Sequence, residues 1–392
     1  MTSSDRLYAP KTVSILGSTG SVGCNTLDLV SRNPEGYDVI ALTANRNVEK
    51  LAAQAIKFKA KCAVIADEAC YEDLKKALSG TRVKAMAGPD ALSEAAQLPA
   101  EWVMASIVGA AGLEPTLSAI RRGATVALAN KECLVCAGDL MMQEVKDSNA
   151  ILLPVDSEHN AIFQVFDFDK ADSVERITLT ASGGPFRDFS MAEMKKVTPA
   201  QAVIHPNWDM GAKISVDSAT MMNKGLEMIE AYHLFPVRED QIDIIIHPQS
   251  VIHSMVTYKD GSILAQLGAP DMRIPIAYTL GWPRRINTPA EKLNLTALKR
   301  LDFLEPDLER FPALRITREA LRRGGTAPTI LNAANEAAVF AFLEGQIGFL
   351  DIANVVEETL QQLDITALTC LKMVHAIDGE ARAVAQELMK KR

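Results

Sequence analysis

Short apolar runs alternate with helical stretches over the first 155 residues of the chain. The runs that read as β-strands are residues 12–16, 38–42, 63–66, 102–107, 125–129 and 151–155. Helical patterns lie between most of them, for example at 26–31, 48–58 and 113–122, the last of which ends at Gly123. Regular alternation of strand and helix predicts a parallel, doubly wound α/β sheet.

The pattern changes in the middle of the chain. Further strands are expected at 176–180, 243–246, 251–258 and 262–267. The last two are joined by Lys259-Asp260-Gly261, a sequence typical of a hairpin turn. A long helix is expected at 218–234. We therefore predict an α+β middle domain.

The last third of the chain divides into an arm and a helical end. Prolines are spaced through residues 282–312, which is typical of a connecting segment. Residues 315–392 carry helical patterns and little strand signal. We predict four parts: an α/β domain at 1–155, the middle domain at 156–281, a linker arm at 282–312 and a C-terminal helical bundle at 313–392.

Composition narrows the classes of function. The 392 residues are 48% hydrophobic and 23% charged, which is usual for a globular protein of two or three domains. A net charge of −8 argues against nucleic acid as a partner, since nucleic acid requires a basic face. A local basic cluster would still bind a small anionic substrate.

Nothing in the sequence predicts a membrane or secreted protein. The apolar runs are too short to span a bilayer, and the first ten residues lack the apolar core of a secretory signal. Six cysteines in a chain of this length fit a reducing compartment, so we expect a cytoplasmic protein. Cys133 and Cys136 form a single CxxC, which we interpret as buried helical thiols rather than a zinc or redox site.

A glycine-rich turn follows the first predicted strand. It reads Gly17-Ser18-Thr19-Gly20-Ser21-Val22-Gly23 and leads into a helix. Glycine lets the backbone approach a pyrophosphate, which then lies on the helix N-terminus. The spacing is GxxGxxG rather than GxGxxG, and a turn without a ligand is the alternative. Its place after the first strand favours a dinucleotide site.

The end of the second strand distinguishes between cofactors. NAD enzymes carry an acid there, which binds the ribose hydroxyls. This chain reads Ala44-Asn45-Arg46-Asn47 instead, with no acid. Because a guanidinium binds a phosphate bidentately, we predict NADP(H) as the cofactor and Arg46 as its 2′-phosphate contact. The alternative is that Arg46 is an ordinary solvated side chain.

Two acids follow the last strand of the first domain. Asp156 and Glu158 are two residues apart and would face the same side of an extended backbone. Neighbouring carboxylates favour a bound cation, and oxygen ligands suit Mg²⁺ or Mn²⁺. Glu227 and Glu230 are both candidates for a third ligand. A helix N-cap followed by first-turn acids is the alternative interpretation.

Polar groups follow two other strands. Asn130-Lys131-Glu132 comes directly after a buried run, where Lys131 could neutralise a substrate oxygen or simply begin a helix. Ser182-Gly183-Gly184 resembles an anion-binding turn. Ser218, Asn223 and Lys224 could complete a phosphate site, although a cap and a surface lysine are equally simple explanations.

A proline-containing loop carries an aromatic side chain. It reads His205-Pro206-Asn207-Trp208 and precedes Gly211. A tryptophan on such a loop suits a lid that excludes water, although it could instead anchor the loop to the core. His247 and His253 lie in strand-like sequence, and we interpret them as structural.

Together these segments resemble the 1-deoxy-D-xylulose 5-phosphate reductoisomerase family. The resemblance covers most of the chain, in the family's order. Its motifs are GSTGSVG from Gly17, IVGAAG from Ile107, LANKE from Leu128, LLPVDSEHNAIFQ from Leu152, SGGPFR from Ser182, HPNWDMG from His205, KISVDSATMMNKGLE from Lys213, IHPQSVIHSMV from Ile246, LAQLGAPDMR from Leu264 and LNAANE from Leu331.

The resemblance implies a role for each candidate residue. NADPH would be bound by Thr19, Gly20, Ser21, Val22, Asn45, Arg46, Asn47, Asn130, Glu132 and Gly211. The metal, Mn²⁺ or Mg²⁺ with Co²⁺ as an alternative, would be bound by Asp156, Glu158 and Glu227. The substrate would be bound by Lys131, Ser157, Glu158, Ser182, His205, Trp208, Ser218, Asn223, Lys224 and Glu227. The residues implied as catalytic are Lys131, Asp156, Glu158, His205 and Glu227.

The resemblance also implies a Rossmann-like NADPH-binding domain at 1–155 and a catalytic and dimerisation domain at 156–281. The family converts 1-deoxy-D-xylulose 5-phosphate to 2-C-methyl-D-erythritol 4-phosphate in the non-mevalonate isoprenoid pathway, and a homodimer is expected. Two segments depart from the family pattern: Asn45-Arg46-Asn47 replaces Gly-Lys-Asn, and Cys133 replaces Ser. Rival interpretations are an NADP-dependent dehydrogenase of another sugar phosphate and a nucleotide-binding regulatory protein.

Overall fold

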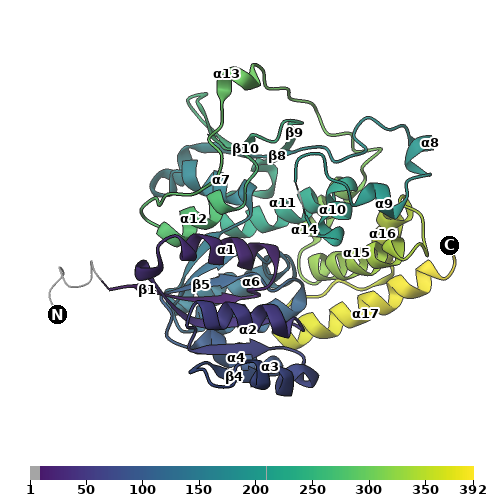
Figure 1. Cartoon of the computed structure of the whole chain (residues 1–392). Coiled ribbons are helices and arrows are strands. Elements are labelled where there is room, and N and C mark those ends of the chain that lie inside the picture. The colour runs from purple at the N-terminus through teal and green to yellow at the C-terminus, as the bar shows by residue number, and fades with distance from the viewer. Residues whose placement is uncertain (1–8, 209) are drawn as a thin grey trace. The chain divides into compact units, whose positions relative to one another are not determined.

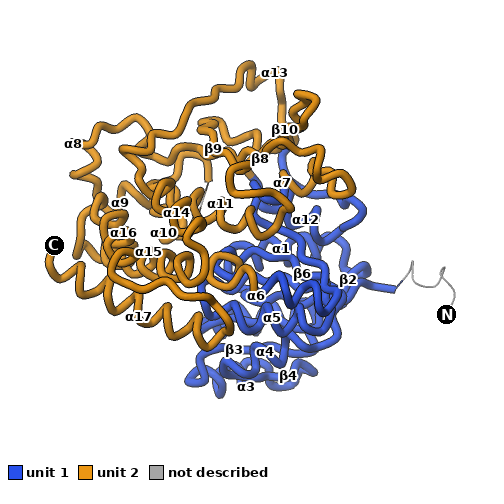
Figure 2. The backbone as a smooth tube through the Cα atoms, turned by 180° about the vertical axis from the view of Figure 1, so that it is seen from behind, with its two compact units in different colours: residues 1–133, 141–160, 271–291 blue, residues 134–140, 161–270, 292–392 orange. Residues whose placement is uncertain are grey.

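The computed structural model describes residues 9–208 and 210–392. These residues form two compact units. Unit 1 contains the chain up to residue 133, with residues 141–160 and 271–291 (Figure 2). Unit 2 contains residues 134–140, 161–270 and 292–392. Each unit combines segments that are distant in sequence, and the four-part division expected from the sequence stays a prediction.

Unit 1 is built on a seven-stranded parallel sheet (Figure 1). Its strands are β1 Lys11–Leu16, β2 Tyr37–Ala44, β3 Cys62–Ile65, β4 Lys84–Ala87, β5 Trp102–Ala105, β6 Thr125–Leu128 and β7 Ile151–Pro154, in the order β4-β3-β2-β1-β5-β6-β7. The order reverses between β1 and β5, which confirms the doubly wound fold. The sequence missed β4, a short edge strand whose residues are exposed or only half-buried.

Helices connect these strands. They are α1 Ser21–Ser31, α2 Val48–Lys57, α3 Tyr71–Ala77, α4 Pro89–Gln97, α5 Leu113–Arg121, α6 Glu132–Ser148 and α7 Ser157–Val165, with part of α6 and of α7 assigned to unit 2. Short 3-10 turns lie at Pro34–Gly36, Glu68–Cys70 and Ala110–Gly112 in unit 1 and at Phe168–Ser173 and Glu239–Gln241 in unit 2. Cys133 and Cys136 are buried on α6, which confirms their interpretation as buried helical thiols.

A late segment of the chain returns to the unit 1 sheet. Helix α12, Arg273–Gly281, contributes buried Ile276 and Leu280 to the core of this unit. The indole of Trp102 donates to the Thr279 carbonyl at 3.1 Å, and the Lys11 amine donates to the Leu280 carbonyl at 2.9 Å. Local sequence pattern did not predict this return, because it depends on contacts across most of the chain.

Unit 2 contains a four-stranded mixed sheet. Its strands are β8 Val174–Ala181, β9 Ile242–Ile246, β10 Ile252–Tyr258 and β11 Ile263–Leu267, in the order β11-β10-β8-β9. Strands β10 and β11 pair antiparallel across a turn in which Gly261 has φ of +87°, so the predicted hairpin is confirmed. Strand β11 forms one edge of the sheet and is largely exposed.

The helices of unit 2 correct one prediction. They are α8 Met191–Met194, α9 Pro199–Ala202, α10 Ala212–Ala219, α11 Met222–Leu234, α13 Leu295–Leu298, α14 Ala313–Arg323, α15 Ala327–Leu343, α16 Asp351–Gln362 and α17 Leu371–Met389. The single helix expected at 218–234 is wrong, because α10 ends at Ala219 and Met221 has φ of +64° before α11 begins. A buried methionine at the break gave no glycine or proline signal.

Helix α15 is the centre of the helical end of the chain. It is buried along most of its length and packs against α16 and α17 (Figure 1). The helical bundle predicted from sequence is therefore confirmed. Within the described residues, no helix combines the length and apolar character that crossing a membrane requires.

Gly225 allows helices α11 and α14 to approach closely. A Cβ at this position would lie 2.4 Å from Oγ1 of buried Thr317. Because neither backbone can move without disturbing the core, we expect Gly225→Ala to reduce the free energy of unfolding by about 1–3 kcal/mol. Urea denaturation and the thermal midpoint measure this change.

Gly379 provides a matched control. It also lies within a helix, α17, but a Cβ there would have no neighbour within 4 Å. Gly379→Ala should be neutral or stabilise by up to about 1 kcal/mol, since alanine is the better helix former. Equal effects of the two substitutions would contradict the packing explanation.

Candidate active site

The glycine turn after β1 presents open backbone amides. Gly17 has φ of +89°, and a Cβ there would lie 2.7 Å from the Ser106 carbonyl oxygen, so only glycine fits. Gly20 is the N-cap of α1, and no side chain caps that end of the helix. The first amides of α1, from Ser21 onward, are therefore available to an anion such as a pyrophosphate.

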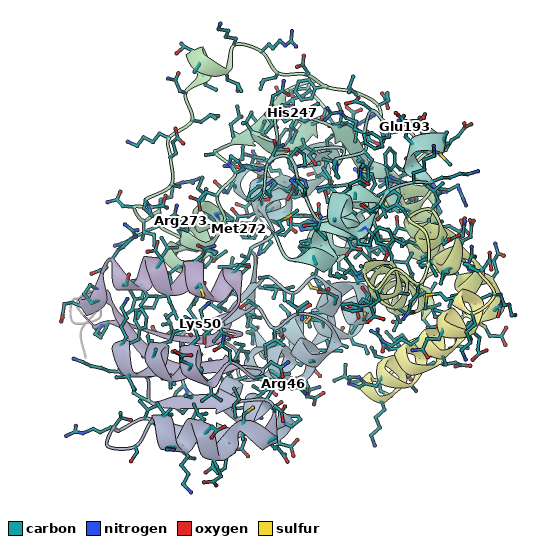
Figure 3. All side chains as sticks on the ribbon, turned by 45° about the vertical axis from the view of Figure 1, so that its right-hand side comes forward. Arg46, Lys50, Glu193, His247, Met272 and Arg273 are labelled. Atoms are coloured by element: carbon teal, nitrogen blue, oxygen red, sulfur yellow. The ribbon has the colours of Figure 1, made fainter. Side chains whose placement is uncertain are left out.

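The residues at the end of β2 form a polar cluster beside this turn. The Lys50 amine, on α2, donates to the Thr19 carbonyl at 2.9 Å, and Asn47 caps α2 by accepting from the Lys50 amide at 3.0 Å. The Arg46 guanidinium pairs with Asp67 at 2.7 Å, although the Arg46 side chain is 77% exposed. Figure 3 labels Arg46 and Lys50. Asp67 comes from the next strand end, and sequence reasoning missed it.

Asn130 shapes the loop after β5. Its side-chain amide donates to the carbonyls of Ile107 and Gly109 at 2.5 and 2.9 Å. A Cβ on Gly112 would lie 2.3 Å from the same Asn130 nitrogen. Asn130 is buried, as is Glu132 at the start of α6. The Asn130 side chain is therefore committed to holding the loop backbone.

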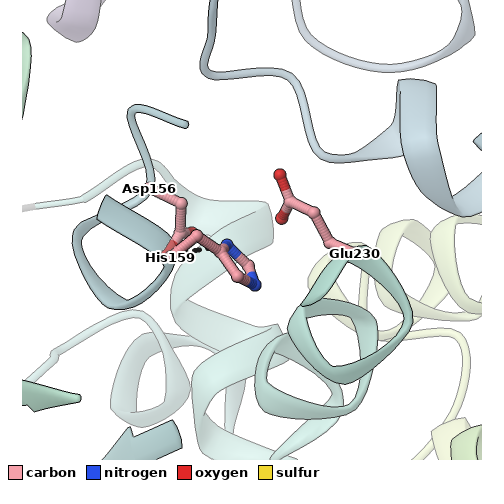
Figure 4. A group of neighbouring side chains, drawn as sticks. All are labelled: Asp156, His159 and Glu230. Atoms are coloured by element: carbon pink, nitrogen blue, oxygen red, sulfur yellow. Dashed lines mark ion pairs between the residues drawn. The ribbon is translucent and has the colours of Figure 1, made fainter. Parts of the chain in front are cut away.

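The predicted acids of unit 1 lie together at the end of β7. The Lys131 amine pairs with Asp156 Oδ2 at 3.0 Å, with both side chains largely buried. Asp156 Oδ1 accepts from the Glu158 amide at 3.2 Å and lies 3.5 Å from the His159 ring (Figure 4). The Ser157 hydroxyl donates to Glu158 at 2.7 Å. A buried lysine thus balances part of a dense negative charge.

The reason given for this pairing from sequence is partly wrong. The backbone is not extended at Glu158, which lies in the first turn of α7, Ser157–Val165. Asp156 accepts from a first-turn amide, as the alternative interpretation expected. Capping uses Oδ1 while Lys131 contacts Oδ2, so one carboxylate takes part in both interactions.

The predicted acid of unit 2 is also balanced by a lysine. Lys224 and Asn223 both donate to the Glu227 carboxylate, each one turn away on α11. Glu227 is 1% exposed and Lys224 is 5% exposed. Glu230, the alternative acid, is buried further along the same helix and is drawn in Figure 4. Asn223 and Lys224, predicted as phosphate contacts, therefore lie beside an acid.

Ser182 and His205 form a second polar group in unit 2. The His205 Nδ1 atom accepts from the amides of Asn207 and Trp208, both at 3.1 Å. The proton of the neutral ring must therefore be on Nε2, which donates to Ser182 Oγ at 3.0 Å. The same oxygen accepts from the Gly184 amide at 3.1 Å. With both of these acceptor positions used, the Ser182 hydroxyl hydrogen is left to donate to a ligand.

Burial sets the charge of His205. It lowers the pKa of this imidazole to about 4, so the ring is neutral at neutral pH. Its role is therefore that of a hydrogen-bond donor through Nε2.

The structure also places three other predicted residues of unit 2: Trp208, Gly211 and Ser218. Trp208 lies 6.2 Å from the His253 ring, measured between centroids. Gly211 is the N-cap of α10, and Ser218 lies near the end of that helix. A Cβ on Gly184 would lie 2.8 Å from the Ser218 carbonyl oxygen, so the serine turn and the end of α10 are in close contact.

Within each unit the structure groups most of the predicted residues. Lys131, Asp156, Ser157 and Glu158 lie together in unit 1, whereas Ser182 and His205 form one group in unit 2 and Asn223, Lys224 and Glu227 another. Sequence reasoning missed Lys50, Asp67, His159 and the side chain of Asn207. Their types and motif positions were visible, but nothing local identified their partners.

Comparison with known proteins covers nearly the whole chain. A family model described as 1-deoxy-D-xylulose 5-phosphate reductoisomerase matches residues 13–138. Two models of C-terminal domains of the same reductoisomerase match residues 152–235 and 267–384. The recognition made from sequence motifs is thus confirmed by three separate matches.

Relatives and solved structures agree with these matches. A 1-deoxy-D-xylulose 5-phosphate reductoisomerase from Zymomonas mobilis is 60% identical, covering 97% of this chain and 98% of its own. One from Rhodospirillum centenum is 62% identical, covering 97% and 94%.

A solved structure of the Zymomonas mobilis enzyme in complex with NADPH is 58% identical with a TM-score of 0.94, covering 98% of this chain and 100% of its own. Another, DOX-P reductoisomerase with NADPH, fosmidomycin and magnesium, is 42% identical with a TM-score of 0.92, covering 97% and 98%. By sequence along nearly its full length and by fold, the chain belongs to the 1-deoxy-D-xylulose 5-phosphate reductoisomerase family.

Proposed function

We propose that the chain catalyses the reaction of its family. It rearranges 1-deoxy-D-xylulose 5-phosphate and reduces it to 2-C-methyl-D-erythritol 4-phosphate, a step of the non-mevalonate isoprenoid pathway, using NADPH and a divalent metal ion. The observation that carries this proposal is a pair of lysine–carboxylate contacts with little exposure: Lys131 with the half-buried Asp156, and Lys224 with the buried Glu227. Proteins rarely bury such dense charge without a functional reason.

The cofactor half of the reaction belongs to unit 1. The segment Thr19, Gly20, Ser21 and Val22, with its uncapped helix start at Ser21, suits the pyrophosphate, and Asn45, Arg46 and Asn47 suit the adenosine phosphate. Asn130 and Glu132 in unit 1, with Gly211 in unit 2, complete the proposed NADPH-binding set. NADPH supplies the hydride, and the role of the chain is to orient the cofactor toward the substrate.

The proposed metal ligands are three acids. Asp156 and Glu158 are half-buried, and Glu227 is buried. Oxygen-only ligation suits Mg²⁺ or Mn²⁺, with Co²⁺ as an alternative. An ion held by these acids would supply Lewis-acid polarisation of the ketone and hydroxyl oxygens of the substrate. Lys131 adds positive charge on the same side.

The phosphate of the substrate is held by hydrogen-bond donors of unit 2. Ser182 can offer its hydroxyl hydrogen because His205 and the Gly184 amide occupy its acceptor positions. Ser218, Asn223 and Lys224 are the other proposed donors. A firm hold on the phosphate keeps the two carbon fragments in place while one bond breaks and another forms. Trp208 and its loop exclude water from them.

Two properties of the whole protein extend the proposal. Strand β11 is an open sheet edge with Ile263, Leu264 and Leu267 exposed, which suits pairing with a second copy in a homodimer.

We also propose a cytoplasmic location, because six cysteines in 392 residues are not the dense framework of a small secreted domain.

Product identification tests the function directly. With 1-deoxy-D-xylulose 5-phosphate, NADPH and Mn²⁺, we expect NMR to show 2-C-methyl-D-erythritol 4-phosphate, and we expect excess chelator to abolish its formation. Added Mn²⁺ or Mg²⁺ should restore the product. Simple reduction of the ketone without rearrangement would favour a plain dehydrogenase, and absence of any NADPH oxidation would favour a regulatory protein.

Asp156→Asn separates metal chemistry from cofactor binding. Asparagine keeps the size and the capping acceptor of Asp156 but loses the charge that binds the cation. We expect kcat to fall by at least about a hundredfold, while the Kd for NADPH, measured by fluorescence titration, stays within roughly twofold. Asp188→Asn, an 80% exposed acid, is the matched control and should keep full activity. Retained rearrangement by Asp156→Asn under chelation would reject the site.

Arg46→Ala tests the choice of cofactor. Loss of the guanidinium should raise the KM for NADPH roughly tenfold, since one charged contact to the 2′-phosphate is removed. The KM for NADH, which lacks that phosphate, should not change. Arg32→Ala, another surface arginine in an ion pair, controls for loss of charge. A similar rise for both cofactors would place the 2′-phosphate elsewhere.

A further inference from the structure

Asn207 attaches its loop to a neighbouring turn of unit 2. One side-chain nitrogen donates twice, to the Pro248 carbonyl at 2.9 Å and to the Ser250 hydroxyl at 3.0 Å. Both hydrogens of the amide are therefore used across 41 and 43 residues of sequence. We call residues 247–250 the docking turn.

The docking turn is also held by contacts with residues 302 and 303, on the side away from Asn207. Ser250 has φ of +50°, an uncommon conformation for serine, and its amide donates to the His247 carbonyl at 3.0 Å. His247 is fully buried and donates from Nδ1 to the Asp302 carbonyl at 2.9 Å. Its ring stacks on Phe303 with centroids 5.0 Å apart. His247 is labelled in Figure 3.

A second contact ties the docking turn to the same segment. The side-chain nitrogen of Gln249 donates to the Asp302 carboxylate at 2.6 Å, and its side-chain oxygen accepts from the backbone amide of Asp302 at 3.3 Å. Beside them, Ile246 and Leu304 form an antiparallel bridge. Hydrogen bonds hold the docking turn at both ends. The side chain of Asn207 therefore connects its loop to a well-anchored part of unit 2.

The loop transmits this attachment to the proposed phosphate site. The Asn207 amide, together with that of Trp208, occupies His205 Nδ1 and so fixes the ring tautomer. The opposite nitrogen of that ring holds Ser182 Oγ. Movement of Asn207 would therefore release the ring and, through it, the direction of the serine hydroxyl.

We propose that Asn207 is a positioning residue for the substrate: by bonding to the docking turn it holds loop 205–208 so that His205 aims the Ser182 hydroxyl at the sugar phosphate. The substrate part of this proposal rests on the proposed function. The attachment of the loop is independent of it and is measured separately.

Loss of the attachment should act on substrate affinity. If the loop samples several conformations, the apparent affinity falls by the fraction that remains competent. For Asn207→Ala we expect the KM for the sugar phosphate to rise roughly 5- to 150-fold, the range for losing two hydrogen bonds. The KM for NADPH should not change, and kcat should fall less than the KM rises.

Two variants and one control carry the experiment. Asn207→Asp keeps the side-chain shape but cannot donate, so it should behave like Asn207→Ala. Ile204→Ala changes a neighbouring loop side chain that is 68% exposed and should behave like wild type. A double-mutant cycle with Ser250→Ala should be non-additive, because the two side chains share a hydrogen bond.

A signal from the loop itself separates positioning from general destabilisation. The chain has three tryptophans, so 5-fluorotryptophan labelling gives three ¹⁹F resonances, and Trp208→Phe assigns one of them. In full-length Asn207→Ala we expect that resonance to shift or broaden while the other two stay unchanged.

The outcomes are distinct. An unchanged Trp208 resonance together with an unchanged substrate KM overturns the proposal, as does an additive cycle. If the wild type turned over no sugar phosphate, the proposed function would fail while the ¹⁹F signal still decided whether Asn207 holds the loop.

Discussion

Buried negative charge is the constraint that organises this protein. Asp156 and Glu227 lie where water is scarce, and an isolated carboxylate there would be strongly unfavourable. Each carboxylate is stabilised by a lysine: Asp156 by Lys131, which follows β6, and Glu227 by Lys224, one turn earlier on α11. Removing either lysine would remove the positive charge that its carboxylate contacts, so the proposed site residues also contribute to stability.

This constraint explains why the site residues follow strands and helix ends. Parallel strands deliver their following residues to one sheet edge, which brings the segment after β6 beside the segment after β7. In unit 2 the break at Met221 allows α10 and α11 to be separate helices, so Ser218 closes one and Lys224 lies in the first turns of the other. One continuous helix over the same residues would fix them along a single axis, whereas the turn lets each helix set its own direction.

Much of this could be predicted from sequence, and the remainder depends on long-range contacts. Strand and helix periodicity predicted the doubly wound sheet, the hairpin and the helical end, because each is encoded within about twenty residues. The return of α12 to the first sheet and the pairing of Arg46 with Asp67 were not predicted. Their residues looked ordinary, since a partner far along the chain leaves no local periodicity. The family itself was recognised from long motifs, whereas spacing misjudged the local backbone: the extended conformation assumed at Glu158 is a helix.

The protonation state of His205 indicates whether this residue would contribute charge or orientation to the proposed phosphate site. A phosphate nearby would favour a charged imidazole, but Nδ1 already accepts two backbone amides and cannot gain a proton without losing both. Burial acts in the same direction, keeping the pKa near 4. The proposed function therefore assigns the positive charge of the phosphate site to Lys224, whose amine donates to the Glu227 carboxylate. On this proposal His205 contributes direction rather than charge, because its proton is held on Nε2 by the two amides at Nδ1.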